Sequence, residues 1–202
     1  LYEKTNPYIL PGPGGHLDLA ETTFEQDSEN TVKVKGTRYV TAPKYTIKLE
    51  GAKCIGYRTV SVAGTRDPIM ISKIDDIVEG VRARVADNYR DKGYKYNLNF
   101  TIYGKNGVMG DLEPVKDAHP HELGIVIEVV ADTQEQADTI CASARSTMLH
   151  YGYEGRRATA GNLAFPFSPS DFHAGRVYVF SMYHIIEVED PTSLFPIDIV
   201  TL

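Results

Sequence analysis

The sequence predicts an α+β protein: a ferredoxin-like βαββαβ sandwich preceded by a small antiparallel β unit. From residue 54 onward, apolar residues recur with the spacings of strand, helix, strand, strand, helix and strand, in that order. Residues 17–49 instead show short alternating runs separated by turn residues. The length of 202 residues, with 42% hydrophobic and 24% charged residues, suits one globular domain with an appendage.

The expected β unit spans residues 17–52. Its strands are predicted at residues 17–25, 32–40 and 45–49, because apolar and polar residues alternate there and turn-rich segments separate them. Residues 1–16 are expected to be a linker from an upstream segment absent from this chain. The chain begins without methionine, and a Pro/Gly-rich stretch comes before the first ordered-looking element.

The expected α/β domain spans residues 53–202 and begins with a strand at 54–63. This strand is apolar on both faces, which suits a central strand. A helix follows, starting at Asp67-Pro68 or at Ser72-x-x-Asp75 and ending at Gly93. Its apolar face repeats at the 3, 4, 7 spacing through Ile74, Ile77, Val78, Val81, Val85 and Tyr89. Strict alternation then predicts an edge-type strand at 94–103.

The second half of the domain repeats this order. Residues 123–131 are predicted to form a second buried strand, and Thr133 with Gln136 makes a capping box for a helix that ends near Gly152. The last strand is predicted at 177–188, and long loops are expected at 105–121 and 153–175. Two helices cover only one sheet face, so the other face should be covered by the β unit, an absent domain or a second copy.

Charge and composition exclude several classes of protein. The net charge of −6 and the lack of a basic block argue against nucleic-acid binding. No apolar run approaches the roughly 20 residues that span a bilayer, so no membrane partner is expected. Two cysteines, Cys54 and Cys141, do not make a disulfide framework, which favours a reducing, cytoplasmic compartment.

Candidate site residues form two clusters, one near the start of each predicted unit. The backbone amides of Gly14 and Gly15 could approach an anion, and His16 with Asp18, two apart on a strand, could act as an acid/base pair. A flexible linker and a hydrogen-bonded surface pair are the alternatives. Arg66, at a helix start, and Arg58, in the preceding strand, could bind a carboxylate or phosphate. The alternative is a local ion pair between Arg66 and Asp67.

The segment 162–173 has the composition of a lid or binding loop, since it is long and carries three phenylalanines together with serine, aspartate and histidine. Its candidate substrate-binding residues are Asn162, Ser168 and His173. The alternative is a loop that only covers the open sheet face.

The remaining chemistry-bearing motifs are weak. His119, His121 and Glu122 lie close together, but their spacing matches no strong metal motif, so no metal site is predicted and no cofactor is identified. The sequence has no Gly-x-Ser-x-Gly, no Cys-x-x-Cys and no complete phosphate-loop signature.

Several short motifs resemble the C-terminal part of the acyclic terpene utilisation (AtuA) family. They are Asn6-Pro7, Pro13-Gly14-Gly15-His16-Leu17-Asp18, Gly64-Thr65-Arg66-Asp67-Pro68, Tyr103-Gly104 through Val108-Met109-Gly110, the nine residues 161–169 (GNLAFPFSP), Asp190-Pro191 and Leu194-Phe195-Pro196. The resemblance implies a cytoplasmic protein of catabolic operons that break down branched acyclic terpenoids or other carboxylic acids. It assigns no catalytic residue, but it emphasises residues 14–18, 66–67 and 162–169.

Two functions follow from these observations. The first is a domain of an AtuA-like catabolic protein that acts on a carboxylate or acyl-CoA-type substrate, with Arg66 as anion anchor, 162–173 as lid and His16 with Asp18 as acid/base groups. The second is a non-catalytic module for oligomerisation, or for docking an upstream domain of the same protein. With either function, we expect a homo-oligomer.

Overall fold

The computed structural model describes residues 5–12, 14–190 and 192–201. The chain divides into two compact units, one formed by Leu1–Ala52 with Phe180–Leu202 and the other by Lys53–Val179. The predicted linker residues 1–4 and the motif residues Pro13 and Pro191 lie outside the described residues.

The first unit is built from short antiparallel strands. β1 (Ile9–Gly12), β2 (Gly15–Asp18) and β5 (Arg38–Thr41) form one sheet in the order β1-β2-β5, and β3 (Thr23–Ser28) pairs with β4 (Thr31–Lys35). The expectation of a linker over 1–16 is therefore corrected, because residues 9–12 and 15–16 belong to a sheet. The expected strand 32–40 is also split, since Gly36 takes a positive φ of 85° between β4 and β5.

A four-stranded sheet in the order β7-β8-β6-β9 organises the second unit. Its strands are β6 (Tyr45–Thr65), β7 (Tyr96–Tyr103), β8 (Leu123–Ala131) and β9 (Asp171–Val188). The central strand β8 pairs antiparallel with both β6 and β7. The two strands expected at 45–49 and 54–63 are one continuous strand, β6, and β9 begins six residues earlier than expected, so the loop before it ends at residue 170.

Three α-helices connect these strands. α1 (Pro68–Ser72) and α2 (Ile74–Tyr89) follow β6, and α3 (Gln134–His150) follows β8. Of the two helix-start signals in the sequence, Asp67 caps the short α1. The Ser72-x-x-Asp75 capping box does not form: the N-cap of α2 is Lys73, without a side-chain hydrogen bond, and the Ser72 hydroxyl donates to the Ile69 carbonyl at 2.8 Å. Gly93 adopts the left-handed conformation (φ 67°) after the short 3-10 helix Arg90–Lys92, and Thr133 caps α3 by accepting a bond from the Gln136 amide at 3.2 Å.

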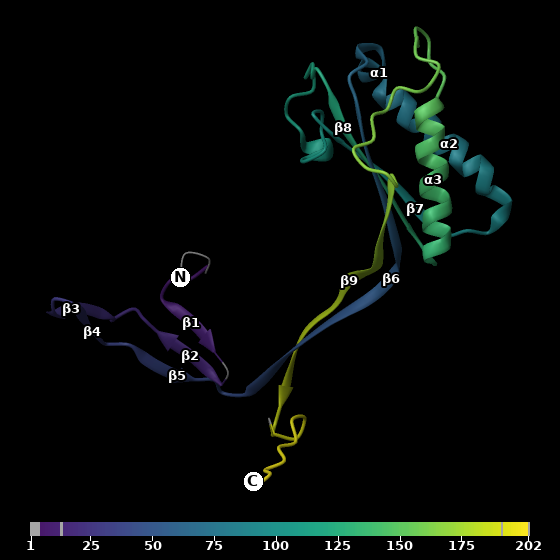
Figure 1. Ribbon diagram of the computed structural model, residues 1–202. Coiled ribbons are helices and arrows are strands. Elements are labelled where there is room, and N and C mark those ends of the chain that lie inside the picture. The colour runs from purple at the N-terminus through teal and green to yellow at the C-terminus, as the bar shows by residue number, and fades with distance from the viewer. Residues whose placement is uncertain (1–4, 13, 191, 202) are drawn as a thin grey trace. The chain divides into compact units, whose positions relative to one another are not determined.

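The core lies between these helices and one face of the sheet (Figure 1). On β8 the buried residues are at odd positions, Leu123 to Ala131, and they meet the apolar faces predicted for α2 and α3. β6 differs from expectation, because its fully buried side chains facing the core include Thr59 and Ser61, while Val60 and Val62 lie half-buried on the opposite face. Cys54, on the part of β6 before this buried stretch, is exposed.

Candidate functional site

A pocket of about 670 Å³ opens where β6 ends and β8 begins. It is bounded by residues 64–67, residues 122–124 and residues 161–164, which are far apart in the sequence. Gly64 and Ala164 join two of these segments through a pair of backbone hydrogen bonds, each 2.8 Å long. The loop before β9 thus adds a short extension to the sheet edge beside β6. Two of the motifs singled out in the sequence therefore line one pocket.

Two glycines make part of the pocket lining. Gly64 on β6 lies directly opposite Gly124 on β8. A Cβ atom built on either glycine would meet its nearest neighbour at an ordinary 3.5 Å, and neither residue has a positive φ. Neither backbone conformation nor crowding therefore requires glycine here. Glycine within a strand often marks close approach by a ligand or another backbone, so the pair leaves room for a bound molecule.

Asp67 joins the elements around the pocket. Its Oδ1 accepts a hydrogen bond from the Ile69 amide at 3.0 Å, which caps α1. Its Oδ2 accepts from the Tyr153 hydroxyl at 2.6 Å and from Nδ2 of Asn162 at 2.9 Å. Burial and the bond to Asp67 raise the pKa of Tyr153 above its ordinary value, so the phenol remains a donor. Asp67 and Asn162 hold the wall of the pocket in place.

Arg66 lines the same pocket with an exposed side chain. The alternative of a local ion pair with Asp67 is not what the structure shows, because both Asp67 oxygens are bonded elsewhere. Among the described residues, no hydrogen bond or ion pair engages the Arg66 guanidinium. Glu122 also lines the pocket, with its carboxylate 3.9 Å from the His121 imidazole. Arg66 therefore leaves a forked cationic donor available to a ligand.

Arg58 belongs to a different place. Its Nε lies 2.5 Å from Oε1 of Glu128, across the β6–β8 pair. It is eight residues from Arg66 along β6, which corresponds to about 26 Å at roughly 3.3 Å per residue. The two arginines therefore do not share one small anion, and the expectation that they would is corrected.

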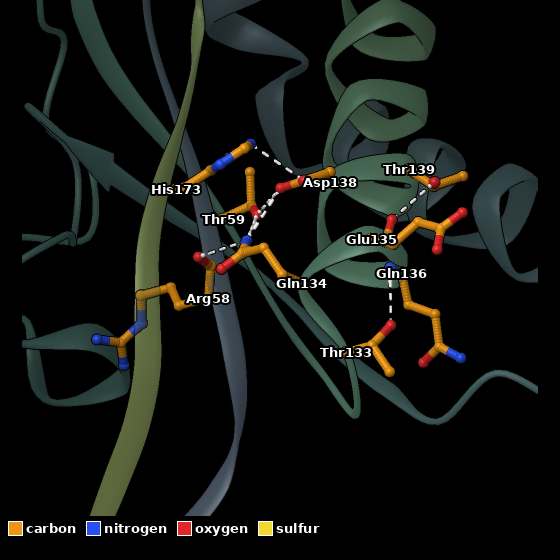
Figure 2. Close-up of polar contacts among 9 residues, drawn as sticks. All are labelled: Arg58, Thr59, Thr133, Gln134, Glu135, Gln136, Asp138, Thr139 and His173. Atoms are coloured by element: carbon orange, nitrogen blue, oxygen red, sulfur yellow. Dashed lines mark hydrogen bonds and ion pairs between the residues drawn. The ribbon is translucent and has the colours of Figure 1, made fainter.

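His173 takes part in a second polar cluster, between α3, β6 and β9 (Figure 2). Its Nε2 lies 3.0 Å from Oδ2 of Asp138, while Oδ1 of Asp138 accepts from the Thr59 hydroxyl at 2.5 Å. Gln134 donates to the same Asp138 oxygen at 3.0 Å and to the Thr59 hydroxyl at 2.7 Å. The carboxylate stands between histidine and hydroxyl. A nucleophilic triad needs the histidine in that position, so this cluster does not activate Thr59.

Polar contacts from the same side of α3, and from β6, also hold the start of β9. Arg145 Nε lies 2.7 Å from Oδ1 of Asp171, and the Ser61 hydroxyl donates to the Ser170 carbonyl at 2.8 Å. Cys141, between these polar groups on the helix, is fully buried, and burial raises the pKa of its thiol to about 12. These polar partners were missed from the sequence. The i, i+4, i+7 and i+11 spacing of Gln134, Asp138, Cys141 and Arg145 on one helix face was the available signal.

The remaining predicted residues lie elsewhere. His16 and Asp18 lie two residues apart on β2 in the first unit. Asp18 accepts a hydrogen bond from the Ala20 amide at 3.0 Å. A Cβ on Gly15 would come within 2.3 Å of the Val40 carbonyl oxygen, so close strand packing also explains that glycine. Ser168 is exposed in the loop before β9. Their proposed roles stay predictions.

The histidine-rich segment 119–122 shows no metal geometry. Within the part of the chain that the structure describes, no three His, Cys, Asp or Glu side chains are grouped to hold a metal ion. His119 lines a separate pocket of about 400 Å³ beside α1, together with Lys105 and Lys116. Arg66 is in the larger pocket and His119 in the smaller one.

Comparison with known proteins identifies the family. A family model, described as acyclic terpene utilisation family protein AtuA, matches residues 1–172 of the 202. The chain belongs to the AtuA family. This confirms the resemblance read from the motifs and connects the chain with the utilisation of acyclic terpenes. No curated protein and no solved structure matches it.

All three pocket segments of this AtuA-family chain, residues 64–67, 122–124 and 161–164, fall inside the matched range, while His173 lies just outside it. None of the helices described is at once long and apolar enough to cross a membrane.

Proposed function

We propose that the second unit of this AtuA-family chain binds a branched acyclic carboxylic acid, or its CoA thioester, in the pocket between residues 64–67 and 161–164. The observation that carries the proposal is the unpaired Arg66 guanidinium on a pocket lined by Gly64 and Gly124. Arginine binds carboxylates through two parallel hydrogen bonds, and also binds the phosphates of CoA.

The shape and lining of the pocket suit such a ligand. Its volume of about 670 Å³ is within the range of small-molecule sites. Leu123, Leu163 and Ala164 line it together with the glycines, so a hydrocarbon chain would lose contact with water there. The acid end would lie at Arg66 and the chain over the glycine pair.

Several finer aspects belong to the same proposal. The strand order β7-β8-β6-β9, with α1–α2 and α3 as connections, supports a ferredoxin-like arrangement of the second unit. We propose a cytoplasmic protein, with His16 and Asp18 as the acid/base pair on a shared face of β2.

Calorimetric titration tests the binding proposal. The probes are geranate, a branched acyclic carboxylate, geranoyl-CoA, and CoA alone. Arg66→Ala is expected to weaken binding of geranate or geranoyl-CoA about 10- to 100-fold, as loss of a charge-assisted contact of roughly 1.5–3 kcal/mol would do. Arg84→Ala, which removes an exposed arginine of α2 that does not line this pocket, is the matched control.

A second variant tests the location of the hydrocarbon chain. Gly64→Val places a side chain into the pocket without backbone strain, and valine suits a strand. We expect an unchanged melting temperature and loss of probe binding. Unchanged affinity in both Arg66→Ala and Gly64→Val would remove this pocket from the site. If the wild-type chain binds none of the three probes, the docking function remains, which the half-buried valines on the open sheet face favour.

A further inference from the structure

The smaller pocket, of about 400 Å³, adjoins the larger pocket that holds Arg66. It lies between α1 and the connection from β7 to β8, which Figure 1 shows at the same end of the second unit. Leu123 lines both pockets. The start of α1 is also divided between them, because Asp67 lines the larger pocket and Pro68 the smaller one. One long ligand can therefore extend from one pocket into the other.

The lining of the smaller pocket offers several donors to an anion. Lys105, Lys116 and His119 line it, and among its described lining residues Asp117 carries the one carboxylate. An ammonium group binds phosphate as a point charge, and an imidazole adds a ring N–H donor. The rest of the lining is mostly apolar and includes Pro120. A few polar groups in a mostly apolar pocket are typical of a small-molecule site.

Backbone contacts hold the two lysines in place. The amides of residues 105–107 all donate to the Ile102 carbonyl, at 3.3, 3.3 and 2.9 Å, so a tight turn fixes Lys105 at the end of β7. Lys116 Nζ donates to the Asp111 carbonyl at 2.9 Å. An ammonium group has three protons, so two of those on Lys116 remain for a ligand.

The other two donors are also accessible to a ligand. The Lys105 ammonium group pairs with the carboxylate of Asp75, in the first turn of α2. The Asp75 side chain is 75% exposed, and exposed pairs contribute little to stability, so this pair can exchange for a phosphate oxygen. Within the described part of the chain, no hydrogen bond or ion pair engages the His119 side chain.

We propose that the smaller pocket binds the phosphate groups of a CoA thioester whose acyl group lies in the larger pocket. This inference rests on the proposed function, and it narrows the substrate class to the thioester. The thioester carbonyl accepts a hydrogen bond from the Arg66 guanidinium, and Lys105 and Lys116 bind the phosphates. A free acid would leave the smaller pocket unused.

Size and position favour the smaller pocket as the site of the CoA phosphates. The nucleotide part of CoA is larger than a branched acyl group, so it must lie outside the larger pocket when the acyl chain fills that pocket. Two other pockets lined by described residues contain arginines, Arg58 in one and Arg84 in the other. Neither shares a lining residue with the larger pocket, whereas the smaller pocket shares Leu123.

Calorimetric titration of the whole chain with geranoyl-CoA, CoA alone and geranate tests the phosphate site. Lys105→Gln and Lys116→Gln are each expected to weaken binding of geranoyl-CoA and of CoA at least about tenfold, because each removes a charge-assisted contact with a phosphate. Geranate affinity should not change, since the free acid has no phosphate. Lys92→Gln, which removes an exposed lysine that lines neither pocket, is the matched control.

A variant that should gain affinity tests the role of Lys105. Asp75→Asn removes the carboxylate that competes for the Lys105 ammonium group. We expect it to bind CoA and geranoyl-CoA about two- to fivefold more tightly, as release from an exposed ion pair would do, and to bind geranate as the wild type does. Unchanged or weaker binding of CoA would contradict a phosphate contact at Lys105.

Two results would overturn the proposal. One is a pair of lysine variants that bind geranoyl-CoA as the wild type does, or that weaken geranate equally, because phosphate contacts would then contribute nothing specific. The other is inorganic pyrophosphate binding at these lysines as tightly as CoA, which would make the smaller pocket a site for a separate phosphate compound.

These failures are distinguishable from failure of the proposed function. Geranate binding that Arg66→Ala and Gly64→Val weaken supports the larger pocket whatever the lysine variants do. Conversely, loss of CoA binding in the lysine variants, combined with unchanged affinity in Arg66→Ala and Gly64→Val, would remove the larger pocket and leave only a phosphate site.

Discussion

The two cysteines of the chain differ in burial. Cys54 is exposed, whereas Cys141, on the core-facing side of α3, is fully buried. Burial, followed by the nearby Asp171 carboxylate, raises the pKa of the Cys141 thiol from 9.0 to about 12. Because the thiolate is the reactive form, Cys141 should not react with thiol reagents at mildly alkaline pH while the chain is folded.

We expect a chromogenic disulfide reagent at about pH 8 to titrate one thiol in the native protein and two in denaturant. Cys54→Ser should abolish the native reaction. Rapid labelling of two thiols in the native protein would contradict the burial of Cys141.

Raising the pH above about 9 should also lower the free energy of unfolding. In that range the Cys141 thiol of the unfolded chain loses its proton, whereas in the folded chain it keeps the proton up to a pKa of about 12. Cys141→Ala should flatten this pH dependence in urea unfolding measurements.

At the scale of elements, the segment between α3 and β9 takes its shape from contacts with its neighbours. Asp67, 86 residues from Tyr153 and 95 from Asn162, fastens it through two hydrogen bonds. Gly161, next to Asn162, has φ +123°, and a Cβ there would lie 2.3 Å from Cδ1 of Leu149. Residues other than glycine rarely adopt this backbone conformation, and a side chain here would also clash with Leu149.

Gly161→Ala is therefore expected to lower the free energy of unfolding by about 1–3 kcal/mol and to weaken probe binding, since residues 162–164 line the pocket. Gly152→Ala, in the same segment, has open space around its Cβ and no positive φ, so it should change neither quantity by more than about 0.5 kcal/mol. Chemical denaturation and calorimetry check both. Equal effects of the two variants would show that the local conformation at Gly161 is not what holds this wall.

For the whole molecule, the two units differ in how much they bury. All buried apolar side chains among the described residues lie between Ala63 and Val177. The β3–β4 hairpin of the first unit is exposed along both strands. A hairpin without a buried face is marginally stable, and unprotected backbone opens easily.

Hydrogen exchange followed by mass spectrometry should therefore show slow exchange in 123–131 and fast exchange in 23–35. Exchange in 23–35 as slow as in β8 would show that a further surface covers the hairpin.

Much of the second unit could be predicted because its local patterns and its packing agree. The stripe from Ile74 to Val85 predicts α2, and Thr133 predicts the start of α3, with boundaries close to those observed. The face of β6 that packs on the helices could not be predicted. The apolar residues Val60 and Val62 suggest that the even-numbered side chains face the core, but the buried side chains are the odd-numbered Thr59 and Ser61. These hydroxyls are buried because Asp138 and the Ser170 carbonyl, distant in sequence, accept their hydrogen bonds.

The sequence by itself determined the α+β class, the order of the elements in the second unit and the AtuA-family motifs, and it marked residues 14–18, 66–67 and 162–169 as candidate site segments. Local propensity, periodicity and capping operate within a few residues, so they are readable in one dimension. Only the tertiary structure decided that Gly64 pairs with Ala164, that Asp67 leaves Arg66 unpaired, and that Arg58 belongs with Glu128. Each depends on groups brought together from distant parts of the chain, where hydrogen-bond satisfaction and space, rather than local pattern, select the partner.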